Sequence, residues 1–98
     1  MKITTKIPES PAIELIAQER KRQIIEEGFT VASDMAMNPN GELAAAAACY
    51  AMPRIAGSNW PWVRSDWKPS PKDRKHELIK SGALIVAEID RLMGVENK

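Results

Sequence analysis

A run of five alanines constrains this fold more than any other feature of the sequence. Ala44–Ala48 lie within the segment GELAAAAACYAM, which has high helix propensity and ends before Pro53. Because alanine has almost no side-chain bulk, neighbouring elements can approach such a helix closely. The run predicts a helix over residues 41–52 that is either central to the fold or packed against a partner chain.

A first helix is predicted from its capping residues. Ser10 offers an oxygen to free backbone amides, and Pro11 occupies the first helical position, where no N–H is needed. Gly28 is suited to the left-handed conformation that ends many helices. We therefore expect a helix over residues 11–27. Its inward-facing stripe at helical spacing would consist of Ile13, Ile16, Ala17, Arg20 and Ile24.

A third helix is predicted to begin after Ser70, Pro71 and Asp73, which resemble a capping box, and to end at Gly94. Gly82 in its middle costs about 1 kcal/mol relative to alanine, so we expect it to mark a close contact with the alanine helix. The predicted apolar face of this helix comprises Leu78, Gly82, Ile85, Val86, Ile89, Leu92 and Met93.

These elements predict an all-α domain over residues 1–98, with three main helices and two long ordered loops. The loops are FTVASDMAMNPN (29–40) and RIAGSNWPWVRSDWKP (54–69), and residues 1–9 and 94–98 are expected to be an irregular lead-in and a frayed tail. Long loops inside compact domains are commonly functional. We also expect the protein to be an oligomer.

Charge and composition exclude several partners. A net charge of +1 gives no overall field toward duplex nucleic acid or an anionic membrane. Residues 23–52 carry four acids and no base, whereas residues 54–80 carry seven bases and three acids. This asymmetry fits mutual packing, self-association, a ligand with anionic groups and a metal, or a plain solvated surface. Cys49 is the only cysteine, and no signal core or membrane-spanning run is present, so we expect a cytoplasmic protein.

All three tryptophans fall in the second loop. Trp60, Trp62 and Trp67 are interleaved with Arg64 and Lys68 and stiffened by prolines. Aromatic rings and cations together can stack and charge-pair a planar anion such as a nucleotide. The same rings could instead fold inward as a lid on a small core. Both arrangements are compatible, because a binding pocket needs rigid walls.

Polar residues of the first helices complete the predicted ligand-binding set. Arg20 lies on the apolar stripe, so it needs either a carboxylate, from Asp34 or Glu42, or an anionic ligand such as phosphate. The predicted ligand-binding residues are Trp60, Trp62, Trp67, Arg64, Lys68, Arg20, Gln23, Glu19, Asp34 and Glu42. No residue is predicted to be catalytic or to ligate a metal.

A magnesium site is the alternative for the acidic residues, which are Glu19, Glu26, Asp34 and Glu42. Mg²⁺ prefers carboxylate oxygens completed by substrate phosphates. Glu19 and Glu26 share one helix face two turns apart, but Glu42 has only alanines three and four residues later. Solvated or salt-bridged acids therefore remain the favoured interpretation.

Several blocks in order, ERKRQIIEEGFTVASD, GELAAAAACYAM, WPWVRSDWKP and ELIKSGALIVAEIDRLM, resemble a group of small helical proteins encoded by tailed phages and prophages. The resemblance covers roughly residues 12–93. That group is distantly similar to the all-α nucleoside triphosphate pyrophosphohydrolases of the MazG type, which hold Mg²⁺ on acidic helices. Their E-E-x-x-E and E-x-x-D pairs are absent here. The H-D-D of the phage group is Ser33–Met35, and Phe29 replaces its tryptophan.

The leading hypothesis is a small phage-type protein that binds a nucleotide or nucleotide-derived ligand without turnover and needs no cofactor. The resemblance implies that it could sequester a nucleotide signal of host defence in the host cytoplasm. One alternative is a Mg²⁺-dependent pyrophosphohydrolase of the MazG type. Another is a non-catalytic interaction protein, with the tryptophan loop as a lid and the alanine helix as a dimer seam.

Overall fold

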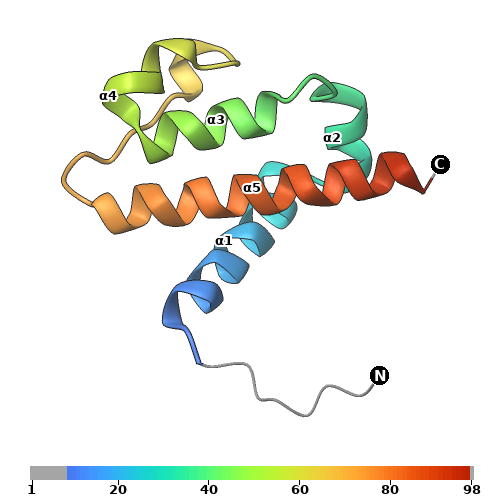
Figure 1. Ribbon diagram of the computed structural model, residues 1–98, viewed down its shortest axis with the longest axis horizontal. Helices are drawn as coiled ribbons and strands as arrows, with labels where there is room; N and C mark the ends of the chain where they lie inside the picture. Colours follow the sequence, from blue (N-terminus) through green and yellow to red (C-terminus); the bar gives the residue numbers. More distant parts are fainter. Residues whose placement is uncertain (1–8, 98) are drawn as a thin grey trace.

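The fold is built around one long helix. A computed structural model describes residues 9–97, within which the elements are helical and no strand occurs. In chain order these are α1 (Pro11–Glu27), α2 (Val31–Met37), α3 (Glu42–Ala51), α4 (Pro53–Ala56), two 3₁₀ turns (Gly57–Asn59 and Arg64–Asp66) and α5 (Arg74–Glu96). Figure 1 shows α3 running antiparallel to α5 while α1 crosses it. The all-α prediction is confirmed. No helix within the described residues is long and apolar enough to cross a membrane.

The first helix has the predicted bounds because the residues that cap it directly flank it in the sequence. Ser10 Oγ accepts a hydrogen bond from the Ile13 amide at 3.4 Å, and Pro11 occupies the first turn. Gly28 has φ 74°, the left-handed conformation, and its N–H bonds the Gln23 carbonyl. Most of the predicted lead-in over residues 1–9 lies outside the described residues.

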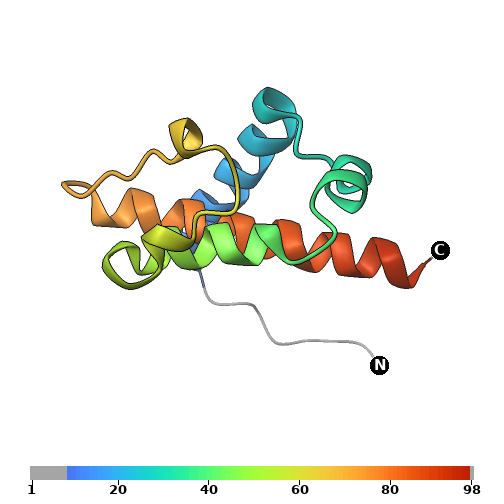
Figure 2. The same ribbon diagram turned by 90° about the horizontal axis from the view of Figure 1, so that it is seen from above.

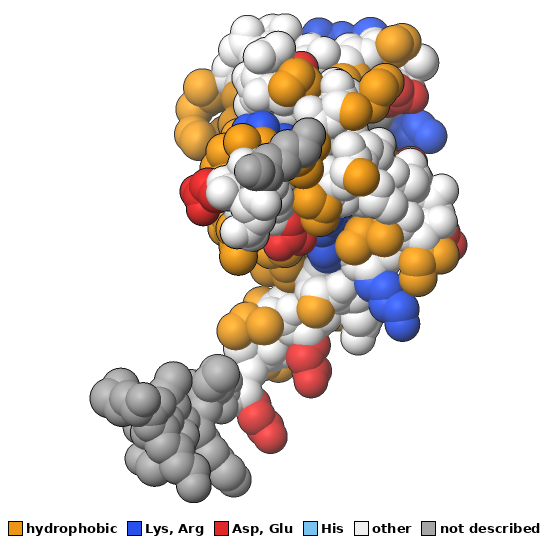
Figure 3. All heavy atoms as spheres, turned by 90° about the vertical axis from the view of Figure 1, so that its right-hand side faces the viewer, with side chains coloured by type: hydrophobic (Ala, Val, Ile, Leu, Met, Phe, Trp, Pro, Cys, Tyr) orange, Lys and Arg blue, Asp and Glu red, His pale blue; other side chains and the backbone are white. Residues whose placement is uncertain are grey.

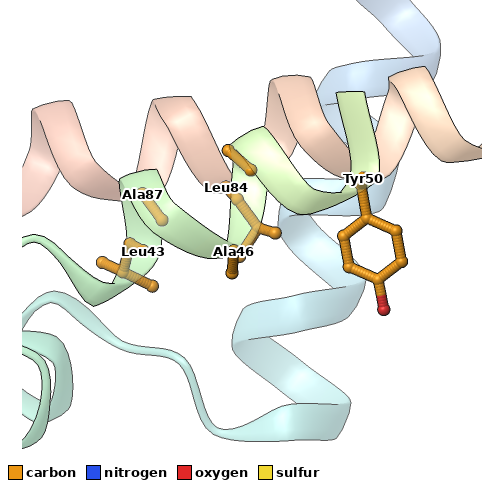
Figure 4. Close-up of a cluster of buried hydrophobic side chains, with 6 residues drawn as sticks. Leu43, Ala46, Tyr50, Leu84 and Ala87 are labelled. Atoms are coloured by element: carbon orange, nitrogen blue, oxygen red, sulfur yellow. The ribbon is translucent and has the colours of Figure 1, made fainter. Parts of the chain in front are cut away.

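The core lies where α3 meets α5. Ala46 and Ala47 of α3 and Ala83 and Ala87 of α5 are at most 1% exposed, and these small side chains let the two backbones come close. Ser81 Oγ donates to the Ala47 carbonyl at 2.8 Å and so links the helices directly. Figure 4 shows the buried cluster, whose larger members are Leu43, Tyr50 and Leu84. The alanine helix is therefore central, which is one of the two placements that the sequence predicted.

Neither predicted long loop is free of helix. The segment 29–40 contains α2, which begins because Thr30 Oγ1 accepts a hydrogen bond from the Ser33 amide at 3.1 Å. The segment 54–69 contains most of α4 and both 3₁₀ turns. The described residues thus form five α-helices rather than three.

The predicted end of the last helix is also wrong. Helix α5 passes through Gly94 and continues to Glu96, so the predicted frayed tail is largely helical. A side chain at Gly94 would lie 2.8 Å from Met35 Sδ and 2.9 Å from Val31 Cγ1. Gly94 therefore marks a close approach of α2 to α5 and does not end the helix.

Most of the apolar face predicted for α5 is exposed. Its large apolar side chains point outward, with Leu78, Ile85 and Ile89 each about half exposed, and the buried positions are Glu77, Ser81, Ala83, Leu84, Ala87 and Arg91. On α1, Ile13 and Ile24 are likewise exposed, and the buried residues are Glu19, Arg20 and Gln23. The inward faces of both helices are therefore largely polar or small.

Gly82 contacts α1 instead of the alanine helix. A Cβ added there would lie 2.7 Å from Ile16 Cδ1, so α1 crosses α5 at this glycine. We expect Gly82→Ala to be less favourable in the native protein than in an Ile16→Ala background. Once Ile16 no longer obstructs the new methyl group, the helix propensity of alanine should stabilise α5 by about 1 kcal/mol. Urea unfolding of the four proteins measures this coupling, and an equal effect of Gly82→Ala in both backgrounds would contradict the contact.

Candidate functional site

A groove of about 720 Å³ lies beside the α3–α5 pair. Figure 2 shows the end of α1, the helix α2 and the tryptophan loop standing on the same side of that pair. The groove is lined by Glu19, Arg22, Gln23, Glu27, Gly28, Phe29, Ser33, Met37, Asn38, Tyr50, Trp60, Pro61, Trp62, Val63, Asp66, Lys68, Lys80 and Leu84. A concave site of this size can hold a small organic ligand.

Two tryptophans form one wall of the groove. The rings of Trp60 and Trp62 meet edge to face, with centroids 5.2 Å apart and planes at 88°. Trp60 Nε1 donates to the Val63 carbonyl at 3.0 Å, and Trp62 Nε1 donates to Asn38 Oδ1 at 2.9 Å. Since both indole N–H groups are occupied, the two rings are fixed before any ligand arrives.

The third tryptophan packs against the core instead. The ring of Trp67 packs 4.9 Å from those of Tyr50 and Trp60, and its edge lies over Gly57. It is absent from the groove lining. All three tryptophans are partly buried and pack against the hydrophobic cluster. The loop is therefore a lid on the core whose outer side, at Trp60 and Trp62, remains open to the groove.

A buried carboxyl group, that of Asp34, holds the tryptophan wall in place through Asn38. Asn38 Nδ2 donates to Asp34 Oδ1 at 3.0 Å, which orients the amide oxygen that holds Trp62. Asp34 is fully buried, and its second oxygen has no hydrogen-bond partner among residues 9–97. Burial raises the pKa of Asp34, although Asn38 and the positive charge of Arg20 oppose this. Asp34 therefore acts through Asn38 and does not line the groove.

The cations of the groove differ in how well they are neutralised. Arg22 makes a two-pronged contact with Glu19, at 2.8 Å and 2.9 Å, and also lies 3.1 Å from Glu27. These hydrogen bonds raise the pKa of Arg22 and lower that of Glu19. Lys80 makes no ion pair within the described residues. Its Nζ instead lies 5.1 Å from the centroid of the Tyr50 ring.

Lys80 is the cation best placed to receive an anion. Burial lowers the pKa of Lys80, with the charge of Glu19 acting in the opposite direction. A partly buried ammonium group without a carboxylate in contact gains more from an incoming anion than a solvated one does. Lys68 also lines the groove and is exposed.

The structure brings half of the predicted ligand-binding residues into the groove. The residues within it are Trp60, Trp62, Lys68, Gln23 and Glu19, and those outside are Trp67, Arg64, Arg20, Asp34 and Glu42. Arg64 donates to the Gly57 carbonyl at 3.0 Å, away from the groove lining. Arg20 is buried as predicted, but the predicted carboxylate partner is wrong. It donates to the Phe29 carbonyl at 2.8 Å and pairs with Asp90 at 3.5 Å.

Sequence reasoning missed five groove residues that matter chemically: Arg22, Phe29, Asn38, Tyr50 and Lys80. For Arg22 a signal existed, because it follows Glu19 by three residues and therefore shares its helix face. The other four lie in separate segments, with Phe29 before α2, Asn38 after it, Tyr50 on α3 and Lys80 on α5, and only the tertiary fold brings them together.

The four acids of the predicted magnesium alternative do not form one site. Glu19 is bound to Arg22, Asp34 to Asn38, and Glu42 Oε1 accepts from the Asn40 amide at 2.7 Å. Glu26 lies at the surface, 3.5 Å from Arg22. Across residues 9–97 no three histidine, cysteine, aspartate or glutamate side chains are grouped so that they could hold a metal ion.

Comparison of the chain with protein-family models, with curated proteins and with solved structures found no significant match.

The buried Asp34 should make stability depend on pH. A carboxyl group whose pKa is raised by folding stabilises the protein fully below its ordinary value of 3.8, and this contribution is lost as pH rises through the folded pKa. We therefore expect Asp34→Asn to increase the free energy of unfolding at about pH 7 and to have little effect near pH 3.5. Urea unfolding at several pH values measures this.

The exposed Asp66→Asn is the matched control for losing one carboxylate. An Asp34→Asn protein that is less stable than the native one at neutral pH would show that the buried carboxylate is well compensated, contrary to this account.

Proposed function

We propose that the groove binds a nucleotide or nucleotide-derived anion without turning it over. The observation that carries this proposal is the fixed pair of Trp60 and Trp62 rings, which lines the same groove as Lys80, a cation without an ion pair in the described part of the chain. A planar base would stack on an indole face, and the phosphate would meet the ammonium group.

The distribution of charge favours an elongated ligand with distinct ends. Glu19 and Glu27 hold Arg22 on the α1 side of the groove, whereas Lys80 and Lys68 have no carboxylate within ion-pair distance among the described residues. Phosphate oxygens would therefore be directed toward Lys80 and Lys68. The wall that holds the base would be the indole pair together with Phe29, whose ring lies 6.1 Å from that of Trp62.

Binding without hydrolysis is favoured by the arrangement of the acids. The carboxylates that a magnesium-dependent pyrophosphohydrolase would use are engaged by other groups or lie apart from one another. A protein that sequesters a nucleotide signal, as the resemblance to phage proteins implies, needs a rigid groove and a cation but no catalytic step.

The proposal is tested by titrating the protein with ATP, deoxynucleotides and cyclic dinucleotides while following tryptophan fluorescence. We expect saturable quenching by at least one of these ligands, because Trp60 and Trp62 would contact the base directly. Unchanged fluorescence with every ligand of the panel up to about 1 mM would contradict the proposal. A dissociation constant of that size corresponds to a binding free energy of about 4 kcal/mol.

Removal of the positive charge of Lys80 should weaken binding of the nucleotide that quenches tryptophan fluorescence. Lys80→Met keeps an unbranched side chain but removes the ammonium group that lies near the Tyr50 ring, and we expect a loss of affinity of about 10- to 100-fold. Lys75→Met is the matched control, because Lys75 is exposed on α5 and does not line the groove. An equal effect of the two substitutions would mean that Lys80 makes no specific contact.

A further inference from the structure

The Tyr50 ring is held in place in the groove by two tryptophans. It meets Trp60 edge to face, with centroids 5.6 Å apart and planes at 86°, and its centroid lies 4.9 Å from that of Trp67. The residue is 6% exposed and lines the groove. Figure 4 shows the ring extending from α3 away from the other labelled side chains, with the hydroxyl at its far end. The position of this hydroxyl is therefore set before a ligand arrives.

The hydroxyl of Tyr50 is suited to donate a hydrogen bond to an anion. Burial raises the pKa of Tyr50, so the group keeps its proton at neutral pH, although the backbone amide of Lys68 acts against this shift. An amide that faces a phenolic oxygen uses one of its acceptor sites and leaves the O–H able to donate. Phosphate oxygens accept such bonds strongly, because they are charged.

Two ammonium groups lie near this hydroxyl. Lys80 Nζ is 5.1 Å from the centroid of the Tyr50 ring, and the Lys68 side chain lines the same groove. Burial lowers the pKa of Lys80, and the positive charge of Lys68 adds to this, so the two ammonium groups repel each other. An anion bound between them would relieve that repulsion.

The acids that line the groove leave these two lysines available. Glu19 and Glu27 both bond Arg22, and Asp66 is exposed, so solvent screens its charge. The face at the C-terminal end of the molecule is different, because Figure 3 shows its Lys and Arg side chains in separate groups among hydrophobic and other side chains. The groove is therefore the better place for an anion that carries more than one charge.

We propose, on the basis of the nucleotide-binding groove proposed above, that Tyr50, Lys68 and Lys80 form a site for a terminal phosphate, so that the ligand is a phosphate monoester and not a diester. A terminal phosphate presents three oxygens and nearly two negative charges, which match one hydroxyl and two ammonium donors. A diester presents two free oxygens and one charge, and would leave one of the three donors without a partner. Cyclic dinucleotides, whose phosphates are all diesters, should therefore be poor ligands.

The proposal is tested by comparing nucleoside 5′-monophosphates with 3′,5′-cyclic monophosphates of the same bases in fluorescence titrations. We expect the 5′-monophosphate to bind at least about 10-fold more tightly than its cyclic counterpart. Tyr50→Phe keeps the ring and removes the hydroxyl, so it should weaken binding of the 5′-monophosphate by about 10-fold and that of the cyclic form much less. Ser58→Ala is the matched control, because it removes an exposed hydroxyl that does not line the groove.

Equal affinities for the two forms of phosphate, or an equal loss for both in Tyr50→Phe, would overturn the terminal-phosphate site while leaving nucleotide binding in the groove intact.

Inorganic phosphate tests the site without a base. The backbone amide NMR signals of Lys68 and Lys80 should shift saturably with up to about 10 mM inorganic phosphate. They should shift less in Tyr50→Phe, and little with sodium chloride of equal ionic strength. Such shifts in a protein that binds no nucleotide would support the phosphate site and contradict base stacking on the tryptophans. Signals that do not respond to inorganic phosphate would overturn the site, even if a nucleotide still quenches tryptophan fluorescence.

Discussion

The close approach of α3 to α5 is the contact on which the rest of the structure depends. Four alanines at the contact are almost completely buried, and the Ser81 hydroxyl fixes the spacing through the Ala47 carbonyl. Small residues bring the backbones together but bury little apolar area. The remaining core volume is therefore supplied by large rings, namely Tyr50 near the end of α3 and the tryptophans of the following loop. That requirement places Trp60 and Trp62 beside the groove.

Polar contacts then position the outer elements of the groove. Arg20 ties the end of α1 to α5 through Asp90 and to the following segment through the Phe29 carbonyl. Asp34 and Asn38 tie the α2 region to Trp62. Such interactions contribute modestly to net stability, but they are costly to leave unmade once buried. They therefore act mainly to fix geometry. The free energy lost by burying the Asp34 carboxyl group follows from its role in orienting Asn38, which holds Trp62.

The sequence predicted features that are set locally and missed those set by tertiary contact. The bounds of α1 follow from Ser10 and Gly28, which are caps, so they could be predicted. Helix α2 has only seven residues, too few to show a period. The apolar face predicted for α5 is mostly exposed, because periodicity does not say whether such a face is buried by its own chain. Lys80 was missed because only the fold brings it to the tryptophans, which are distant in sequence.

Two-dimensional NMR of the three indole N–H groups, with increasing ATP or the nucleotide that quenches fluorescence, tests the central claim most directly. That claim is a groove walled by preset tryptophan rings that captures a planar anion. The account predicts saturable shifts for the Trp60 and Trp62 signals, while Trp67, packed over Gly57 away from the groove lining, stays nearly unchanged. Signals of Trp60 and Trp62 that do not move with any nucleotide, or a shift confined to Trp67, would contradict it.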